Sequence, residues 1–216
     1  MRTLHTHKKA FTMIELVFAI VVLGIIASMA LPRMERDNRQ EAADNILSAI
    51  RYTQHLALLD NKTDPSDVDW QMKLWKIDFT TGDNSFYTVS SDNNKNGAVA
   101  KNETAIDPAN GKYMYHLSSN PTQADESPNV ALGEKYGIDT ITGTGGCNSP
   151  KQIAFGPMGR PFNDLNTVGT NDHNDYEQYM SSDCNLTFTF QGGQEDLVIT
   201  VKKETGYAQI VGQEDS

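Results

Sequence analysis

The stretch FTMIELVFAIVVLGIIASMALP, residues 11–32, decides the fold of this chain. Its 22 residues contain a single ionisable side chain, Glu15. At about 1.5 Å per residue, a helix of that length measures about 33 Å, which is enough to cross the hydrocarbon core of a bilayer. The sequence therefore predicts a helix that can span a membrane.

The ten residues before this stretch, MRTLHTHKKA, are cationic. They contain Arg2, Lys8 and Lys9 and no acidic residue. Positive charge beside the start of an apolar span favours a cytoplasmic location for that end. We therefore expect a single pass, with the N-terminus in the cytoplasm and the rest of the chain on the far side of the membrane.

Glu15 stands out because a carboxylate inside an apolar helix costs several kcal/mol in hydrocarbon unless it has a partner. Residues 11–32 contain no lysine, arginine or histidine. The partner must come from another chain or from a free amino group made by proteolysis. The alternatives for this region are a plain membrane anchor, which does not explain Glu15, and a secretory signal cut after Ser28-Met29-Ala30. The carboxylate and the long apolar run argue against that signal.

The motif KKA followed by FTMIEL, residues 8–16, resembles the type III leader of type IV pilins and type II secretion pseudopilins. The resemblance implies that a prepilin peptidase cuts between Ala10 and Phe11 and that the new amine of Phe11 is methylated. It implies that Glu15 pairs with this amine on a neighbouring subunit during assembly. Ala10 departs from the family, in which glycine usually precedes the cut.

The helix is predicted to continue beyond the apolar stretch as an amphipathic half over residues 33–60. Gly24 and Pro32 stand where pilins often carry glycine and proline. Pro32 is expected to kink or locally melt the helix, and Asp60-Asn61 to end it. In pilin-like proteins this half packs on a small antiparallel sheet. The fold class is therefore α+β, with a long N-terminal helix packed on a β-rich domain at residues 61–216.

Alternating apolar residues and turn signals predict sheet from Trp70 onwards. Two hairpins are expected, and a further strand is predicted at residues 136–142. Residues 153–207 are similar to the closing strands of H-type minor pseudopilins and FimT-like minor pilins, which implies one sheet with strands at 152–155, 185–191 and 196–203. The first hairpin pairs residues 70–79 with residues 85–90, and its first strand is expected to contain a bulge near Leu74 and Trp75. The second hairpin pairs residues 98–106 with residues 112–118.

Residues 33–216 hold 15 lysines and arginines against 27 acidic residues, a net charge of about −12. A surface of this sign repels phosphate backbones, which argues against direct binding of nucleic acid. Cys147 and Cys184 both lie in the exported part, and an even count in an oxidising compartment predicts one disulfide. Two free buried thiols are the alternative.

Residues 92–103, DNNKNGAVAKNE, match the calcium-loop pattern D-x-[DN]-x-[DN]-G-x5-E. The predicted ligands are Asp92, Asn94, Asn96 and Glu103. A strand rather than a helix is predicted before this loop, so a turn rich in Asn and Gly that needs no ion is the alternative. No other cofactor is predicted.

Nothing in the chain has the pattern of a catalytic site. The polar segment 163–182 contains His173 and several acids, and we interpret it as a solvated loop rather than a metal cluster because nothing fixes the ligand spacing. No Ser/His/Asp order or paired carboxylates stand out. We therefore predict that the protein is not an enzyme.

The resemblance implies a structural subunit, a minor pilin or pseudopilin of a type II secretion or type IV pilus-like filament. The implied partners are prepilin peptidase, other pilin or pseudopilin subunits, an inner-membrane assembly platform, and lipid before assembly. The C-terminal domain is expected in the periplasm. A minor pilin for DNA uptake or adhesion and a membrane-anchored periplasmic binding domain are the alternatives. The tail GYAQIVGQEDS lacks the basic residues through which some FimT-like pilins bind DNA.

Overall fold

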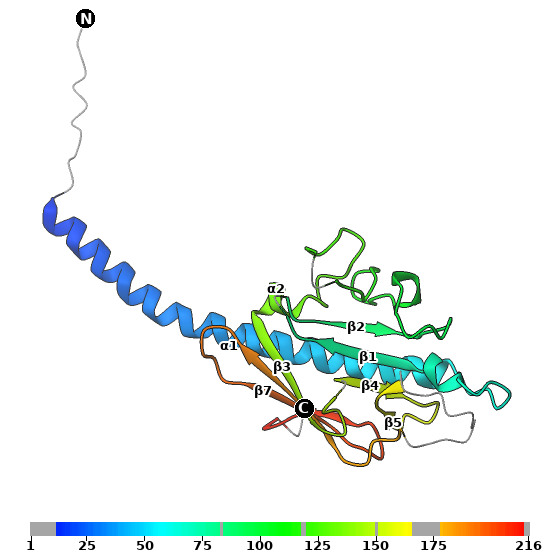
Figure 1. Ribbon diagram of the computed structural model, residues 1–216. Helices are drawn as coiled ribbons and strands as arrows, with labels where there is room; N and C mark the ends of the chain where they lie inside the picture. Colours follow the sequence, from blue (N-terminus) through cyan, green and yellow to red (C-terminus); the bar gives the residue numbers. More distant parts are fainter. Residues whose placement is uncertain (1–11, 83, 118–119, 150, 166–177, 214–216) are drawn as a thin grey trace, which may run out of the picture. The chain divides into compact units, whose positions relative to one another are not determined.

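The computed structural model describes residues 12–82, 84–117, 120–149, 151–165 and 178–213, without the side chains of 27–37. The chain divides into two compact units, Met1–Asn38 and Arg39–Ser216. Helix α1 (Met13–Leu59) begins in the first unit and ends in the second, which also holds the strands (Figure 1). The expected α+β class, a helix followed by antiparallel sheets, is confirmed.

Helix α1 is continuous through Pro32, so the expected local melting at this proline is wrong. A proline removes one backbone donor, and the helix continues on both sides of it. Among the described residues, no helix is both long and apolar enough to cross a membrane. Of the predicted span, residue 11 and the side chains of 27–32 lie outside that description. The helix ends as predicted, with Asp60 N donating its hydrogen to Leu56 O at 2.9 Å.

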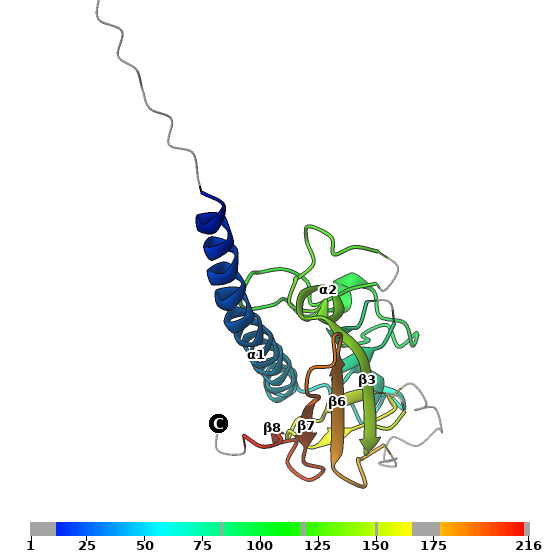
Figure 2. The same ribbon diagram turned by 90° about the vertical axis from the view of Figure 1, so that its left-hand side faces the viewer.

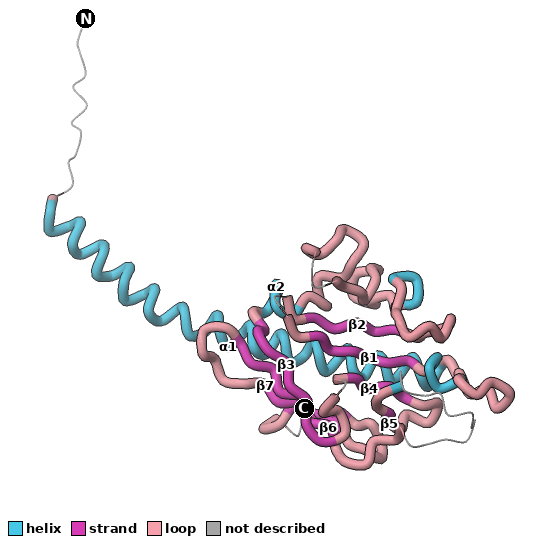
Figure 3. The backbone as a smooth tube through the Cα atoms, in the orientation of Figure 1, coloured by secondary structure: helices cyan, strands magenta, loops and turns pink. Residues whose placement is uncertain are grey.

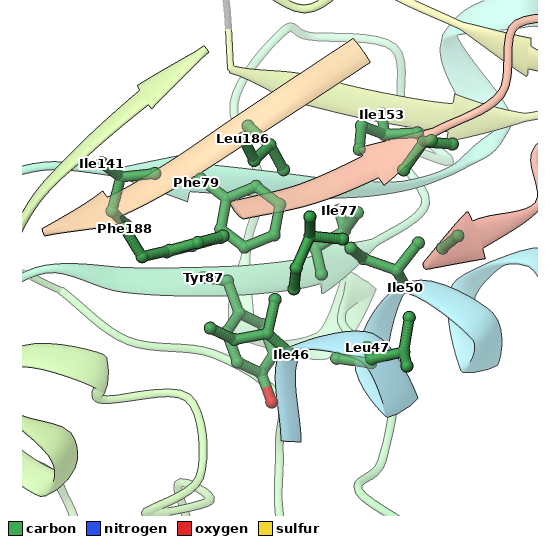
Figure 4. Packing of buried hydrophobic residues seen from close by; sticks show 14 of the residues in the cluster. Ile46, Leu47, Ile50, Ile77, Phe79, Tyr87, Ile141, Ile153, Leu186 and Phe188 are labelled. Carbon is green, nitrogen blue, oxygen red and sulfur yellow. The ribbon is translucent and has the colours of Figure 1, made fainter. Parts of the chain in front are cut away.

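The second half of α1 buries one face, as its amphipathic pattern predicts. Apolar side chains three and four residues apart fall on the same side of a helix. Here they form part of the main core together with residues from both sheets (Figure 4). The buried members on this part of the helix are Ala42, Ala43, Ile46, Leu47, Ala49, Ile50 and Ala57.

The first sheet has four antiparallel strands in the order β2-β1-β4-β5. They are β1 (Trp75–Thr80), β2 (Phe86–Ser90), β4 (Gln152–Phe155) and β5 (Pro161–Phe162). The predicted hairpin of β1 with β2 is confirmed, and Thr80 pairs with Phe86 beside the turn. The bulge near Leu74 and Trp75 is wrong, because Trp70–Lys73 forms the 3-10 turn η1 and the strand begins after it. The slip in the alternation marks this change from turn to strand.

The second sheet has the antiparallel order β3-β6-β7-β8 (Figure 2). Its strands are β3 (Ile138–Gly145), β6 (Cys184–Phe190), β7 (Leu197–Val201) and β8 (Ala208–Ile210). The strand predicted at 136–142 starts two residues later, since Tyr136 ends helix α2 (Leu132–Tyr136) and Gly137 caps it at φ +72°. Residues 152–155 do not join this sheet as expected, because they pair with β1, where Ile153 lies opposite Ile77.

The second predicted hairpin is only partly present. Residues 107–111 make the expected turn, and Ile106 bridges Tyr113 in antiparallel fashion. Lys101–Glu103 is the 3-10 turn η2 rather than strand. Most of this region is loop (Figure 3), and part of it is held against β2 by a bridge between Ser90 and Thr104.

The core lies where the two sheets and the second half of α1 meet (Figure 4). Phe79 of β1 and Phe188 of β6 meet edge to face with ring centroids 5.5 Å apart. An aromatic pair in this geometry contributes about 0.5 to 1.5 kcal/mol beyond the burial of its surface. Contacts of this kind join the two sheets into one unit.

Candidate functional site

The start of helix α1 is marked by a pair of polar side chains. Glu15 N donates to Thr12 Oγ1 at 3.4 Å, and Thr12 Oγ1 donates to Glu15 Oε2 at 3.5 Å. Threonine followed three residues later by glutamate is a pattern typical of a helix N-terminus. The same carboxylate lies in the first turn, where the helix dipole favours negative charge. The sequence carried this signal, and our sequence reasoning did not use it.

Glu15 sits among apolar side chains that nothing in the described structure covers. Met13 is 88% exposed and Phe18 is 70% exposed, and the following apolar residues up to Ile26 are also largely exposed. Within the described residues, Glu15 forms no ion pair with a basic side chain. A contiguous exposed apolar surface marks a site of contact with protein or lipid. The geometry therefore presents one carboxylate on an apolar contact surface.

The remaining residues predicted at this site are less informative. Ala10 and Phe11 lie outside the described residues, so processing and methylation there stay predictions. Gly24 is helical, and a Cβ on it would meet nothing within 4 Å. The side chain of Pro32 also lies outside the description.

The two cysteines form a disulfide, Cys147 to Cys184, with their Cα atoms 5.1 Å apart. Both are fully buried in the main core. Cys184 begins β6 and pairs with Gly145 at the end of β3. A Cβ on Gly145 would overlap the carbonyl oxygen of Asp183, so only glycine allows β3 to approach β6 this closely. The alternative of two free thiols is therefore wrong for this structure.

The predicted calcium loop is closed by its own carboxylates. Asp92 Oδ2 accepts a hydrogen bond from Gly97 N at 2.9 Å. Glu103 Oε1 and Oε2 accept from Asn94 N at 3.2 Å and Ala100 N at 3.1 Å. The two acidic side chains thus organise the turn through backbone donors, as side chains of this kind do in turns rich in Asn and Gly. Calcium binding by this loop stays a prediction.

The acidic loop 163–182 falls mostly outside the described residues, and His173 is among those omitted. In the part of the chain that is described, no three His, Cys, Asp or Glu side chains come together as a group that could hold a metal ion. The interpretation of residues 163–182 as a solvated loop stays a prediction.

The fold is a long N-terminal helix joined to a domain of two antiparallel sheets, and its first described turns are exposed, apolar and marked by one carboxylate. Residues 5–31 match the family model of the prokaryotic N-terminal methylation motif. The chain therefore carries a type IV prepilin leader. Comparison with curated proteins gave no match, and comparison with solved structures gave none.

This match bears on several of the sequence predictions. The motif indicates a pilin-like substrate of prepilin peptidase that assembles with other pilins in association with a membrane. It favours a structural protein over an enzyme. It covers only the region around the start of α1, so the kind of filament is a matter for proposal.

Proposed function

We propose that this chain is a structural subunit, a minor pilin or pseudopilin, of a filament of the type II secretion or type IV pilus kind. The observation that carries the proposal is the methylation motif at residues 5–31 together with Glu15, a carboxylate without a basic partner in the described chain. The exposed apolar side chains of Met13 to Ile26 supply the surface through which subunits pack. The minor-subunit role rests on the sequence resemblance of residues 153–207 alone, and of the strands that this resemblance implied, 152–155 pairs with β1 instead.

Assembly gives the Glu15 carboxylate the positively charged partner that it needs in an apolar environment. Cleavage between Ala10 and Phe11 exposes an amine at the start of the mature chain. When the apolar helices of two subunits pack together, the amine of Phe11 on one subunit meets the Glu15 carboxylate on the next. Removing one member of a buried charge pair costs about 3 to 5 kcal/mol, because the other charge stays buried and unpaired. Glu15 therefore controls whether a subunit enters the filament.

Before assembly, residues 11–32 lie in the inner membrane, residues 1–10 in the cytoplasm and residues 33–216 in the periplasm. The apolar composition of the stretch and the positive leader support this topology. The same apolar surface thus contacts lipid first and neighbouring helices later.

The test is incorporation of Glu15→Gln into filaments, measured by shearing filaments from cells and quantifying the subunit. The variant keeps the size and the polar cap of the helix and removes the charge, so we expect correct cleavage and a loss of incorporation of at least tenfold. Glu195→Gln, which removes an exposed acid of the C-terminal unit, is the matched control and should assemble normally. Normal incorporation of Glu15→Gln would contradict the proposed pairing.

The two alternatives predict different results. A subunit of a DNA-uptake or adhesion filament would also depend on Glu15, and loss of DNA uptake or of adhesion with secretion intact would identify it. A membrane-anchored periplasmic binding domain would keep its leader and would be insensitive to Glu15→Gln.

A further inference from the structure

A cavity of about 360 Å³ opens in the C-terminal unit, between the second half of α1, strand β2, the turn at 107–109 and helix α2. This volume lies at the lower end of the range for small-ligand sites, about 300 to 1,000 Å³. Three tyrosines, Tyr52, Tyr87 and Tyr136, form part of its wall. The methylation motif and the apolar start of α1 contribute no residue to this cavity.

The cavity is negatively charged. Its wall includes Glu41, Asp44 and Asp107 and one basic residue, Lys135. Lys135 Nζ is already paired with Glu41 Oε1 at 3.0 Å. Asp44 accepts a hydrogen bond from the amide of Gln40 at 3.0 Å, and within the described residues neither Asp44 nor Asp107 has a basic partner within ion-pair distance. Two negative charges therefore face the cavity without compensation.

Asp107 is the deepest of these acids, with only 5% of its surface exposed. Burial raises the pKa of its carboxyl, but hydrogen bonds from Ser127, the Ala109 N–H and the amides of Asn129 and Asn110 lower the pKa below its usual range. The amide donors lie at 2.9 Å for Asn129 and 3.0 Å for Asn110. All of these donors are neutral, so they keep the carboxylate ionised and do not cancel its charge.

The tyrosines in the wall are neutral, and the charge of Asp107 affects their pKa. Burial, followed by the negative charge of Asp107, raises the pKa of the Tyr52 and Tyr87 hydroxyls. Burial is also the largest cause of the raised pKa of Tyr136. Neutral aromatic rings stabilise cations placed against their faces by about 0.5 to 2 kcal/mol. Tyr87 and Tyr136 are only 1% and 4% exposed, and Lys135 Nζ already lies 4.8 Å from the centroid of the Tyr136 ring. The half-buried Tyr52 is therefore the tyrosine whose ring is open to a ligand, and it lies beside uncompensated carboxylates.

We propose that this cavity binds a guanidinium or primary ammonium group carried on an alkyl chain. The charge of the wall repels an anion. A divalent metal ion needs several free carboxylate or carbonyl oxygens at about 2.0 to 2.6 Å, whereas Asp107 Oδ2 already accepts three hydrogen bonds. An alkyl cation fits this wall, because its charge contacts the exposed carboxylate of Asp44 and is attracted at longer range by Asp107, while its carbon chain packs on the half-buried ring of Tyr52. Its source is either a free small molecule or the side chain of an arginine or lysine on another protein.

The test is isothermal titration calorimetry of the full chain in detergent. The ligand is n-butylguanidinium, and n-butylurea is the neutral control of the same shape. We expect saturable binding of the cation alone, weakened by added salt because charge attraction is screened. Asp44→Asn should weaken binding about three- to tenfold, and Lys135→Gln should strengthen it by a similar factor. Asp139→Asn, which removes an exposed charge outside the cavity, should change nothing.

The opposite effects at Asp44 and Lys135 separate a binding site from a merely structural cluster. Equal binding of n-butylurea, or the same direction of change in both variants, would overturn the proposal, as would the absence of binding. A capped peptide, acetyl-Gly-Arg-Gly-amide, then distinguishes the sources. Binding of both peptide and n-butylguanidinium identifies a protein side chain as the ligand, and binding of n-butylguanidinium alone identifies a free small molecule.

Discussion

Removing the disulfide should destabilise the C-terminal unit by an amount that follows from its loop. The perturbation is the double variant Cys147→Ala with Cys184→Ala. The bond joins residues 37 apart in sequence, and on the chain-entropy model a loop of this size is worth roughly 4 kcal/mol. In a domain of this size, 1 kcal/mol corresponds to about 2 to 4 °C in Tm. The double variant should therefore melt roughly 8 to 16 °C below the parent.

Thermal melting followed by circular dichroism, with and without reductant, measures this effect. Both cysteines are fully buried, so reductant reaches them only when the unit unfolds. The parent should melt lower when reductant is present during heating, whereas the double variant should be insensitive to it. A double variant that melts within about 2 °C of the oxidised parent would refute the claim that this bond stabilises the unit by restricting the conformations of the unfolded chain.

Three further predictions test the core, the cavity and the loop. Ile50→Ala should lower the free energy of unfolding, measured in urea, by about 2 to 5 kcal/mol because Ile50 is fully buried. Leu58→Ala, at a site 52% exposed, should lower it by less than about 0.5 kcal/mol. Equal losses in the two variants would contradict the burial of Ile50. The lowered pKa of Asp107 contributes stability that is present above the unfolded pKa of about 4 and is lost as pH falls through the folded pKa. Asp107→Asn should therefore lower the free energy of unfolding by about 1 to 3 kcal/mol at pH 7 and by progressively less below about pH 4, as measured in urea titrations. A loss that does not depend on pH would contradict the lowered pKa of Asp107. The pattern of residues 92–103 predicts that calcium at about 1 mM raises the Tm of the parent and not that of Asp92→Asn. An unchanged Tm of the parent would contradict calcium binding by this loop.

Local patterns in the sequence were sufficient to predict the elements that depend on neighbouring residues. The amphipathic half of α1 follows from helical spacing, and the β1–β2 hairpin follows from the turn signal at residues 81–84. The disulfide was predicted from an even number of cysteines in the part of the chain that is expected to be exported. In the helix and the hairpin the local signal and the tertiary structure agree, whereas the disulfide joins residues 37 apart and was predicted from the cysteine count.

Elements that depend on distant residues could not be predicted. Residues 152–155 form a short run with all four residues buried, and such a run carries no signal for which strand it pairs with. Helix α2 has five residues and is too short to show a helical period. The order of two separate sheets is likewise a property of packing rather than of any single segment.

The candidate sites divide in the same way. Glu15 is identifiable because one carboxylate in an apolar run is visible in the sequence alone. The cavity depends on Asp44, Asp107 and Lys135, which come from three different elements and meet only after folding. No spacing rule connects them.

The most direct test of the central claim is the mass and N-terminal sequence of the protein extracted from membranes of cells with and without prepilin peptidase. We predict that the mature chain begins at a methylated Phe11 only when the peptidase is present. A chain that begins at Met1 or Leu31 in both kinds of cell would contradict the assignment as a filament subunit.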